Sequence, residues 1–276
     1  MAESVYSYES LMNMEPMLLR ALLRERIHHT IECRLYPALY AHKELKPLPE
    51  EVARRMLKVW RDRNLPEDGQ DIQWALRLLE AYDQVLAGEK PNIEGMHPCS
   101  FNESERQGVE RAIFGRRSYR QWSDQEVAPS MIDRILEAGM WAPSACDIQP
   151  IRFLVLDTDE VLAKVPSREF SGEKVKIILC VDTRPYEIRT SIPKRNHYFD
   201  CAAAAENMVL MAEVLGLGAV WSTFNERDLL LVKEVFALPD YLEVCTYISL
   251  GYASERVLAP GRMSLDDVVL FRASSG

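Results

Sequence analysis

The sequence predicts an α+β fold that follows an all-helical N-terminal extension. Three observations support this division. Apolar residues recur at helical spacing through residues 1–90. The next segment, 88–100, is rich in Gly and Pro and has no periodicity, so we expect a linker at 91–103. In the remaining part, 104–276, helical segments alternate with short β-branched runs, which is typical of a sheet covered by helices.

The extension contains three amphipathic stripes. The first covers 18–35, and Pro47 and Pro49 should end it and start the second. The third covers 72–86 and is closed by Gly88, a residue type that commonly follows a helix end. Because a unit of this size is marginally stable alone, we expect its apolar faces to pack on the rest of the protein or on a partner subunit.

The elements of 104–276 follow from periodicity and caps. Two apolar runs, 151–157 and 175–182, suit strands that are buried on both faces. The segment 199–215 is apolar almost all round and rich in Ala, which suits a helix in the middle of a domain or at a dimer interface. The other expected elements are helices at about 104–115, 130–141 and 226–237 and strands at 219–224 and 244–250.

Composition excludes several classes of protein. The chain has 276 residues, 47% of them hydrophobic and 27% charged, which is ordinary for a protein with a packed core. A net charge of −9 argues against nonspecific nucleic-acid binding.

No run approaches the ~20 apolar residues that span a membrane, and the start of the chain lacks a signal-peptide pattern, so we expect a cytoplasmic protein. Six scattered cysteines predict reduced thiols, four of them buried, and no metal site.

The most informative local feature is the segment Gly115-Arg-Arg-Ser-Tyr-Arg120. Arg116, Arg117 and Arg120 place three fork-shaped cationic donors within five residues, with Ser118 between them. Guanidinium groups match the geometry of phosphate oxygens. On these residues alone, a phosphate site and a solvated basic helix end both remain open.

Further segments strengthen the first of these interpretations. They are Ala142-Pro-Ser-Ala-Cys-Asp-Ile-Gln-Pro150, the strand at 151–157, Asp200 to Trp221, Leu250-Gly-Tyr-Ala253 and Pro260-Gly-Arg262. In this order and spacing, the region from about 104 to 272 resembles the nitroreductase family of FMN-dependent flavoproteins. The resemblance implies a three-layer fold with a central mixed sheet between helices, and FMN at a homodimer interface.

The resemblance also implies a set of site residues. The phosphate and ribityl chain of FMN would meet Arg116, Arg117, Ser118, Arg120 and, from the far end of the chain, Arg262. Pro143, Ser144, Asp147 and Gln149 would lie along the isoalloxazine edge. Trp221, Ser222 and Thr223 would pass the ring near its hydride-accepting nitrogen, so that Ser222, Thr223 and Asp147 are the candidate catalytic residues. From the residues alone, Trp221 also suits a core position and Gln149 a turn.

Asp147 departs from the family pattern, which has Asn at this position. An Asn can donate to a flavin carbonyl, whereas an ionised Asp can only accept a hydrogen bond. Asp147 therefore turns away from the flavin, accepts a hydrogen bond from an N–H of the ring or from a substrate group, or is protonated because burial raises its pKa. A carboxylate beside the flavin would lower its reduction potential by disfavouring the anionic reduced ring.

The loop at 183–198 is a candidate substrate cover. Tyr186, Arg189, Arg195 and His197 could contact an anionic substrate or a nicotinamide phosphate, and a solvated basic loop is the alternative.

The resemblance leads to one main hypothesis and two alternatives. The main one is a homodimeric FMN-dependent oxidoreductase that uses NADH or NADPH to reduce a small nitroaromatic or quinone-type acceptor by alternate-binding hydride transfer. The second is a specialised member of the superfamily: a small-molecule or peptide dehydrogenase, a dehalogenase or a flavin-fragmenting enzyme. The connection between the strands at 151–157 and 175–182 is too short for a deiodinase-type lid, which disfavours dehalogenation. The third is a flavin-binding redox or ligand sensor with slow turnover.

Overall fold

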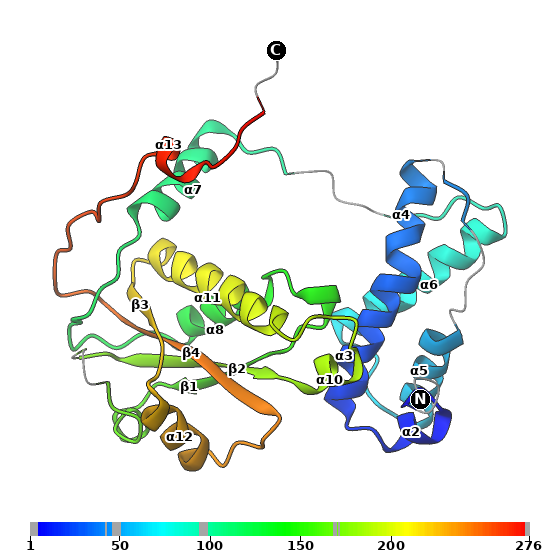
Figure 1. Cartoon of the computed structure of the whole chain (residues 1–276), viewed down its shortest axis with the longest axis horizontal. Coiled ribbons are helices and arrows are strands. Elements are labelled where there is room, and N and C mark those ends of the chain that lie inside the picture. Colours follow the sequence, from blue (N-terminus) through cyan, green and yellow to red (C-terminus); the bar gives the residue numbers. More distant parts are fainter. Residues whose placement is uncertain are drawn as a thin grey trace.

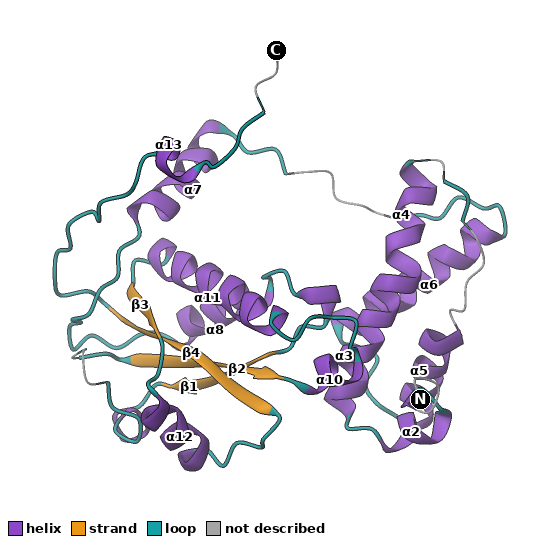
Figure 2. Ribbon diagram, in the orientation of Figure 1, coloured by secondary structure: helices purple, strands orange, loops and turns teal. Residues whose placement is uncertain are grey.

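The protein contains a helical part and a sheet with its covering helices (Figure 1). The structure, a computed structural model, describes residues 5–41, 43–45, 51–93, 99–167, 170 and 172–273. Four strands form one sheet, and helices make up most of the remaining regular structure in these residues (Figure 2). The α+β class predicted from the sequence is confirmed.

The N-terminal helices correspond to the three stripes but divide them further. The first stripe becomes a continuous helical run in which a π-helical turn interrupts the α-helix, and Pro47 and Pro49 lie outside the described residues. Gly88 follows the last helix with φ of 79°, as predicted. The elements are α2 (Tyr8–Asn13), α3 (Pro16–Ile27), η1 (His28–Glu32), α4 (Cys33–Tyr40), α5 (Glu51–Asp62) and α6 (Gln70–Leu86).

These helices enclose a hydrophobic core of their own. Leu22, Ile27, Met56, Trp60 and Tyr82 are among its buried residues. Helix α3 packs against both α5 and α6, so the apolar stripes converge on one interior. The apolar faces therefore pack largely on one another, and the expected packing on the rest of the protein is met in part, because Ala21 of α3 belongs to the core of the second part.

The second part follows the expected elements closely. Asn102 and Glu105 form a capping box at its first helix. In the described parts of the chain, no helix combines the length and apolar character needed to cross a membrane. The elements are α7 (Glu103–Gly115), α8 (Pro129–Met140), η2 (Ala145–Asp147), β1 (Ile151–Leu156), α9 (Asp159–Leu162), β2 (Val175–Asp182), α10 (Arg184–Ile188), α11 (Asn196–Val214), β3 (Gly218–Ser222), α12 (Glu226–Val235), β4 (Leu242–Gly251) and α13 (Leu265–Val268).

The strands lie in the order β1-β2-β4-β3, and every neighbouring pair is antiparallel. The resemblance implies a mixed sheet, and the structure differs in this detail. Among the described residues, the parallel pairing is confined to a single bridge between Ser118 and Ala219. An apolar run predicts that both faces of a strand are buried, but it does not predict whether the strand pairs parallel or antiparallel with its neighbours.

Both faces of the sheet are covered, as the sequence predicts. Ile177 and Leu179 of β2 belong to the core that α8 and α11 share, whereas Ile178 and Cys180 belong to a second cluster with α12. All eight positions of β2 are buried. Figure 1 shows the resulting layers, with α8 and α11 on one side of the sheet and α12 on the other. The start of α11 and the end of β3 come together in this arrangement, and a cavity lies there.

Candidate functional site

The predicted ring-contacting residues of β3 border a cavity of about 450 Å³. It lies between β3, β4 and the start of α11. Trp221 is 38% exposed, so it is not a core residue. The lining residues are Tyr198, Cys201, Ala202, Trp221, Ser222, Thr223, Cys245 and Thr246. The structure thus brings Trp221, Ser222 and Thr223 together in one hollow.

Thr246 fixes the edge of this cavity, and the sequence interpretation missed it. The indole Nε1 of Trp221 donates to Thr246 Oγ1 at 2.6 Å, and the Thr246 hydroxyl donates to the carbonyl of Ser222 at 2.5 Å. Thr246 is nearly fully buried. Its hydroxyl within the apolar run at 244–250 was the available signal, because a buried hydroxyl needs a partner.

Cysteines supply part of the cavity wall. All six cysteines are free thiols, and Cys180 and Cys201 are fully buried, rather than the expected four. A hydrogen bond with Cys245, together with burial, raises the pKa of Cys201. Cys201 therefore remains a protonated, weakly polar group at neutral pH.

The arginine segment runs beside the other end of β3. The N–H of Tyr119 donates to the carbonyl of Ala219 at 3.1 Å, and the indole of Trp122 donates to the carbonyl of Gly218 at 2.7 Å. These bonds fix the main chain around Ser118. The arginines and the cavity are consequently held by opposite ends of one short strand.

The arginine side chains retain free donor capacity. Arg117 Nη1 donates to the carbonyls of Phe114 and Arg116, both at 2.8 Å, and Arg120 Nη1 donates to the carbonyl of Ser118 at 3.2 Å. In the described part of the chain, no carboxylate forms an ion pair with Arg116, Arg117 or Arg120. In a chain of net charge −9, three guanidinium groups without a counter-ion fit the phosphate of FMN.

Glu255 and Arg262 are two other charged residues that bear on this anion site. Glu255 Oε1 accepts the main-chain N–H of Arg120 at 2.5 Å, so one carboxylate lies next to the segment. Arg262 is exposed and donates to the carbonyl of its neighbour Gly261 at 3.1 Å. Among the described residues, no hydrogen bond or ion pair joins Arg262 to the arginine segment. Its part in an anion site therefore stays a prediction.

The loop after α8 has an unusual backbone. Cys146, Asp147 and Gln149 have φ values of 53°, 56° and 52°, in the left-handed region that non-Gly residues rarely adopt. Within the loop, Ser144 Oγ accepts the N–H of Gln149, and Gln149 Nε2 donates to Asp147 Oδ1, both at 3.0 Å. Pro143 is exposed. Such a conformation persists only where surrounding contacts hold it.

Asp200 at the start of α11 is one of those contacts. Its Oδ1 accepts the N–H of Ala145 at 2.9 Å, and its Oδ2 accepts the hydroxyl of Tyr186. Asp200 is 5% exposed, and burial raises its pKa although both hydrogen bonds act in the opposite direction. The sequence interpretation gave Asp200 no role, although a carboxylate that begins an apolar helix was the available signal.

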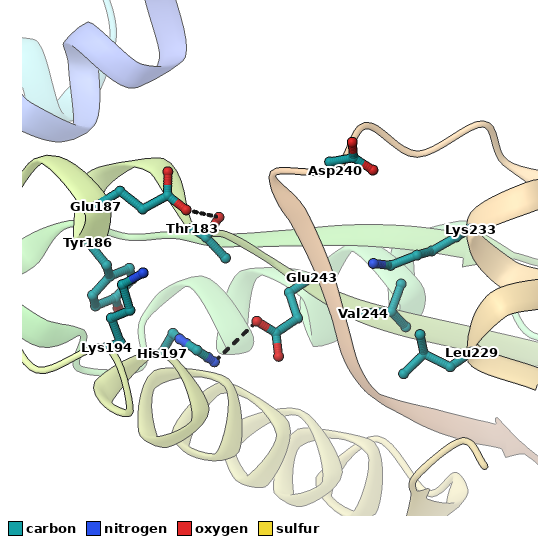
Figure 3. Close-up of a pocket in the computed structure, with 10 residues that line it drawn as sticks. All are labelled: Thr183, Tyr186, Glu187, Lys194, His197, Leu229, Lys233, Asp240, Glu243 and Val244. Atoms are coloured by element: carbon teal, nitrogen blue, oxygen red, sulfur yellow. Dashed lines mark hydrogen bonds and ion pairs between the residues drawn. The ribbon is translucent and has the colours of Figure 1, made fainter. Parts of the chain in front are cut away.

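A second cavity, also about 450 Å³, contains two of the four predicted substrate residues (Figure 3). Its lining residues are Thr183, Tyr186, Glu187, Lys194, His197, Leu229, Lys233, Asp240, Glu243 and Val244. His197 Nε2 lies 3.4 Å from Glu243 Oε2. A dashed line in Figure 3 marks this contact. Arg189 instead turns to Glu25 of α3, at 2.9 Å, and Arg195 is exposed. Neither Arg189 nor Arg195 is among the residues that line this cavity.

Comparisons with known proteins agree on one family. The model of the nitroreductase family matches residues 113–177 and 174–252. A curated protein of Methanothermobacter thermautotrophicus, named "Putative NADH dehydrogenase/NAD(P)H nitroreductase", is 36% identical over 168 residues, which are 58% of this chain and 83% of that protein. An Archaeoglobus fulgidus protein of the same name is 32% identical over 156 residues, 52% of this chain and 85% of that protein.

Solved structures show the same likeness. The crystal structure of "a putative nitroreductase in complex with FMN" from Desulfovibrio desulfuricans is 30% identical, with a TM-score of 0.53, and the match covers 63% of this chain and 99% of that chain. A "Putative NADH dehydrogenase/NAD(P)H nitroreductase" from Parabacteroides distasonis is 28% identical, with a TM-score of 0.52, covering 62% and 98%. The family model begins at residue 113, so helices α2 to α6 lie outside it.

Proposed function

This chain belongs to the nitroreductase family of oxidoreductases, and from that membership we propose that it uses FMN and either NADH or NADPH to reduce a small electron-poor acceptor. The acceptor class would be nitroaromatic or quinone-type. The observation that carries the proposal is the arrangement on β3. Guanidinium groups without an ion-pair partner among the described residues lie at one end, and an open cavity lies at the other. FMN needs both an anion site and a partly apolar site for its ring.

Each group of residues has a proposed task. Arg116, Arg117 and Arg120, with Ser118, would bind the phosphate, and Arg262 would join them. When bound, FMN would supply the redox chemistry between the nicotinamide and the acceptor. Ser222 and Thr223 would hydrogen-bond the ring edge from an end of β3 that Thr246 keeps in place. Pro143, Ser144, Asp147 and Gln149 would line the opposite edge. Tyr186 and His197 would meet the substrate.

We also propose that the protein is a homodimer with the flavin between subunits. Helix α7 has no buried residue, and Ile113 and Phe114 are 51% and 74% exposed. Near the C-terminal end, Leu270 and Phe271 are 98% and 85% exposed. Apolar surface of this extent is typical of an interface, and a second copy would cover it.

The chain would then divide into residues 1–90 as a helical extension, 91–103 as a linker and 104–276 as the FMN-binding domain. The separate core of the N-terminal helices supports this division. The six free cysteines support a reducing location such as the cytoplasm.

Purified protein should be yellow, and its absorbance near 450 nm should bleach under anaerobic conditions when NADH or NADPH is added. Addition of a nitroaromatic compound or a quinone should restore the colour. Light scattering should give twice the mass of one chain. A colourless protein that cannot be reconstituted with FMN would contradict the proposal.

Replacing Asp147 with Asn should raise the midpoint potential of bound flavin by about 40–65 mV. A unit charge about 6 Å from the reduced ring, at an effective dielectric of about 20, costs roughly 2–3 kcal/mol, and a two-electron couple moves about 30 mV for each 1.4 kcal/mol. Dye equilibration measures the potential. Asp133→Asn, an exposed position on α8, removes the same charge and should leave the potential unchanged. An unchanged or lower potential in D147N would place its carboxylate away from the ring.

A further inference from the structure

We propose that the N-terminal helices form part of the flavin site, and that Arg24 of α3 is a positioning residue for the loop at 144–149. The inference rests on the proposed function, because it takes this loop to lie beside FMN. No part of α3 belongs to the region that the family model matches. The role would therefore be a property of this chain's extension.

Arg24 connects three parts of the chain. Its Nη2 donates to the carbonyl of Ile148 at 2.6 Å, and its Nε donates to the carbonyl of Asp147 at 3.3 Å. Its Nη1 donates to Asp71 of α6 at 2.6 Å. The side chain is 4% exposed. A planar guanidinium with three separate acceptors has little freedom to move, so the loop is fixed relative to α3 and α6.

The charge of Arg24 is balanced where it is buried. Burial lowers its pKa, and the charge and hydrogen bonds of Asp71 oppose that effect. Burial also disfavours ionisation of Asp71, but the bonds and charges of Arg20 and Arg24 outweigh it and lower its pKa to about 2. A buried ion pair is a weak source of stability because both groups lose their water. Its directed bonds to two loop carbonyls indicate a role in positioning.

The loop needs such a partner. Ile148 is fully buried, and a buried carbonyl without a donor costs about 1–3 kcal/mol. Arg24 satisfies this carbonyl and that of Asp147, which lie among residues with left-handed backbone. Inside the loop, Ser144 is hydrogen-bonded to Gln149, and Gln149 to Asp147. Without the Arg24 guanidinium, this loop conformation would lose its hydrogen bonds to α3.

The next residue on α3 holds the neighbouring segment. Glu25 is fully buried and accepts hydrogen bonds from Arg26 at 2.7 Å and Arg189 at 2.9 Å. Arg189 ends α10, the helix whose Tyr186 donates to Asp200. Arg24 therefore binds the loop at 144–149, and Glu25 binds the end of α10. Asp200 joins the same two segments, because it accepts hydrogen bonds from Ala145 in the loop and from Tyr186 in α10.

The test compares Arg24→Met with Arg20→Met in the full chain. Arg20 also binds Asp71, through Nε at 2.7 Å, but makes no hydrogen bond to the loop among the described residues. R24M should weaken FMN binding about tenfold or more, measured by quenching of flavin fluorescence, because two charge-assisted bonds are lost. It should also speed amide hydrogen exchange at residues 145–149 in protein without FMN. R20M should stay within about twofold of the unchanged protein in both measurements.

Equal behaviour of R24M and R20M in both measurements would overturn the inference. If R24M does not fold, Arg24→Lys serves instead, because it keeps a positive charge near Asp71 without a fork that reaches two carbonyls. If R24K has the same amide hydrogen exchange at residues 145–149 and the same FMN affinity as the unchanged protein, the inference is also overturned. If the unchanged protein binds no FMN, the proposed function fails, while exchange in the loop still tests whether Arg24 holds it.

Discussion

Removing Arg116 and Arg120 together should weaken FMN binding by at least about a hundredfold. Each guanidinium bonded to phosphate contributes about 1.5–3 kcal/mol, and 1.4 kcal/mol corresponds to a factor of ten in affinity. Titration of the R116A/R120A protein with FMN, followed by flavin fluorescence, measures the loss. Arg117 is kept because its side chain supports the carbonyls of Phe114 and Arg116.

The matched control is R106A/R111A. Both arginines lie on α7, and each donates to a main-chain carbonyl near its own position, Phe101 for Arg106 and Gln107 for Arg111. The control removes the same total charge from the same region. It should change FMN affinity by less than about threefold, since exposed charges are screened. A similar loss in both double variants would show that net charge, rather than a specific anion site, controls FMN binding.

Replacing Asp200 with Ala should lower the free energy of unfolding by about 2–4 kcal/mol. The change leaves the N–H of Ala145 and the buried hydroxyl of Tyr186 without their acceptor, and each unsatisfied buried group costs about 1–3 kcal/mol. Urea unfolding measures the change. FMN affinity should fall as well, because the loop at 144–149 loses its anchor on α11.

Tyr186→Phe separates the two contacts of Asp200. It removes the hydroxyl, and with it the donor to Asp200 Oδ2, but leaves the bond to Ala145, so it should cost about 1–3 kcal/mol and spare FMN affinity. If Y186F weakens FMN binding as strongly as D200A, the Ala145 bond is not what supports the loop.

Asp200 should also leave a signature in the pH dependence of stability. Its pKa in the folded protein lies above the ordinary value of 3.8, so the unfolded chain releases this proton more readily. The stability that Asp200 contributes is thus fully present below pH 3.8 and declines as pH rises through the folded-state pKa. The difference in unfolding free energy between wild type and Asp200→Asn should be largest in acid and shrink toward neutral pH. A difference that is constant with pH would contradict the raised pKa.

Local patterns predicted the elements well. The apolar run at 175–182 coincides with β2, and the helix expected at about 226–237 corresponds to α12, which Asn225 caps. The tryptophan and hydroxyl residues at 221–223 line a cavity, and their contact with a flavin ring stays a prediction. These features depend on residues that are close together in sequence, so periodicity, caps and short motifs can reveal them.

Contacts between distant segments could not be read in the same way. Arg24 is separated by more than a hundred positions from the loop that it contacts, and nothing local to either segment indicates the pairing. The same holds for Arg189, which is a basic loop residue in the sequence but pairs with Glu25 in the structure. Buried charge partners are chosen by the tertiary fold, and charge patterns along the chain carry little information about them.

The separate hydrophobic core of α2 to α6 has a consequence for how the chain can be divided. If residues 1–90 form a separate unit, as proposed, a cut after α6 passes between two cores, although Ala21 of α3 belongs to the second one. The polar contacts of Arg24 and Glu25 cross that boundary. If Arg24 positions the loop as proposed, the folding unit and the functional unit have different limits. A fragment that starts at residue 91 could then be well folded and still carry an incomplete site.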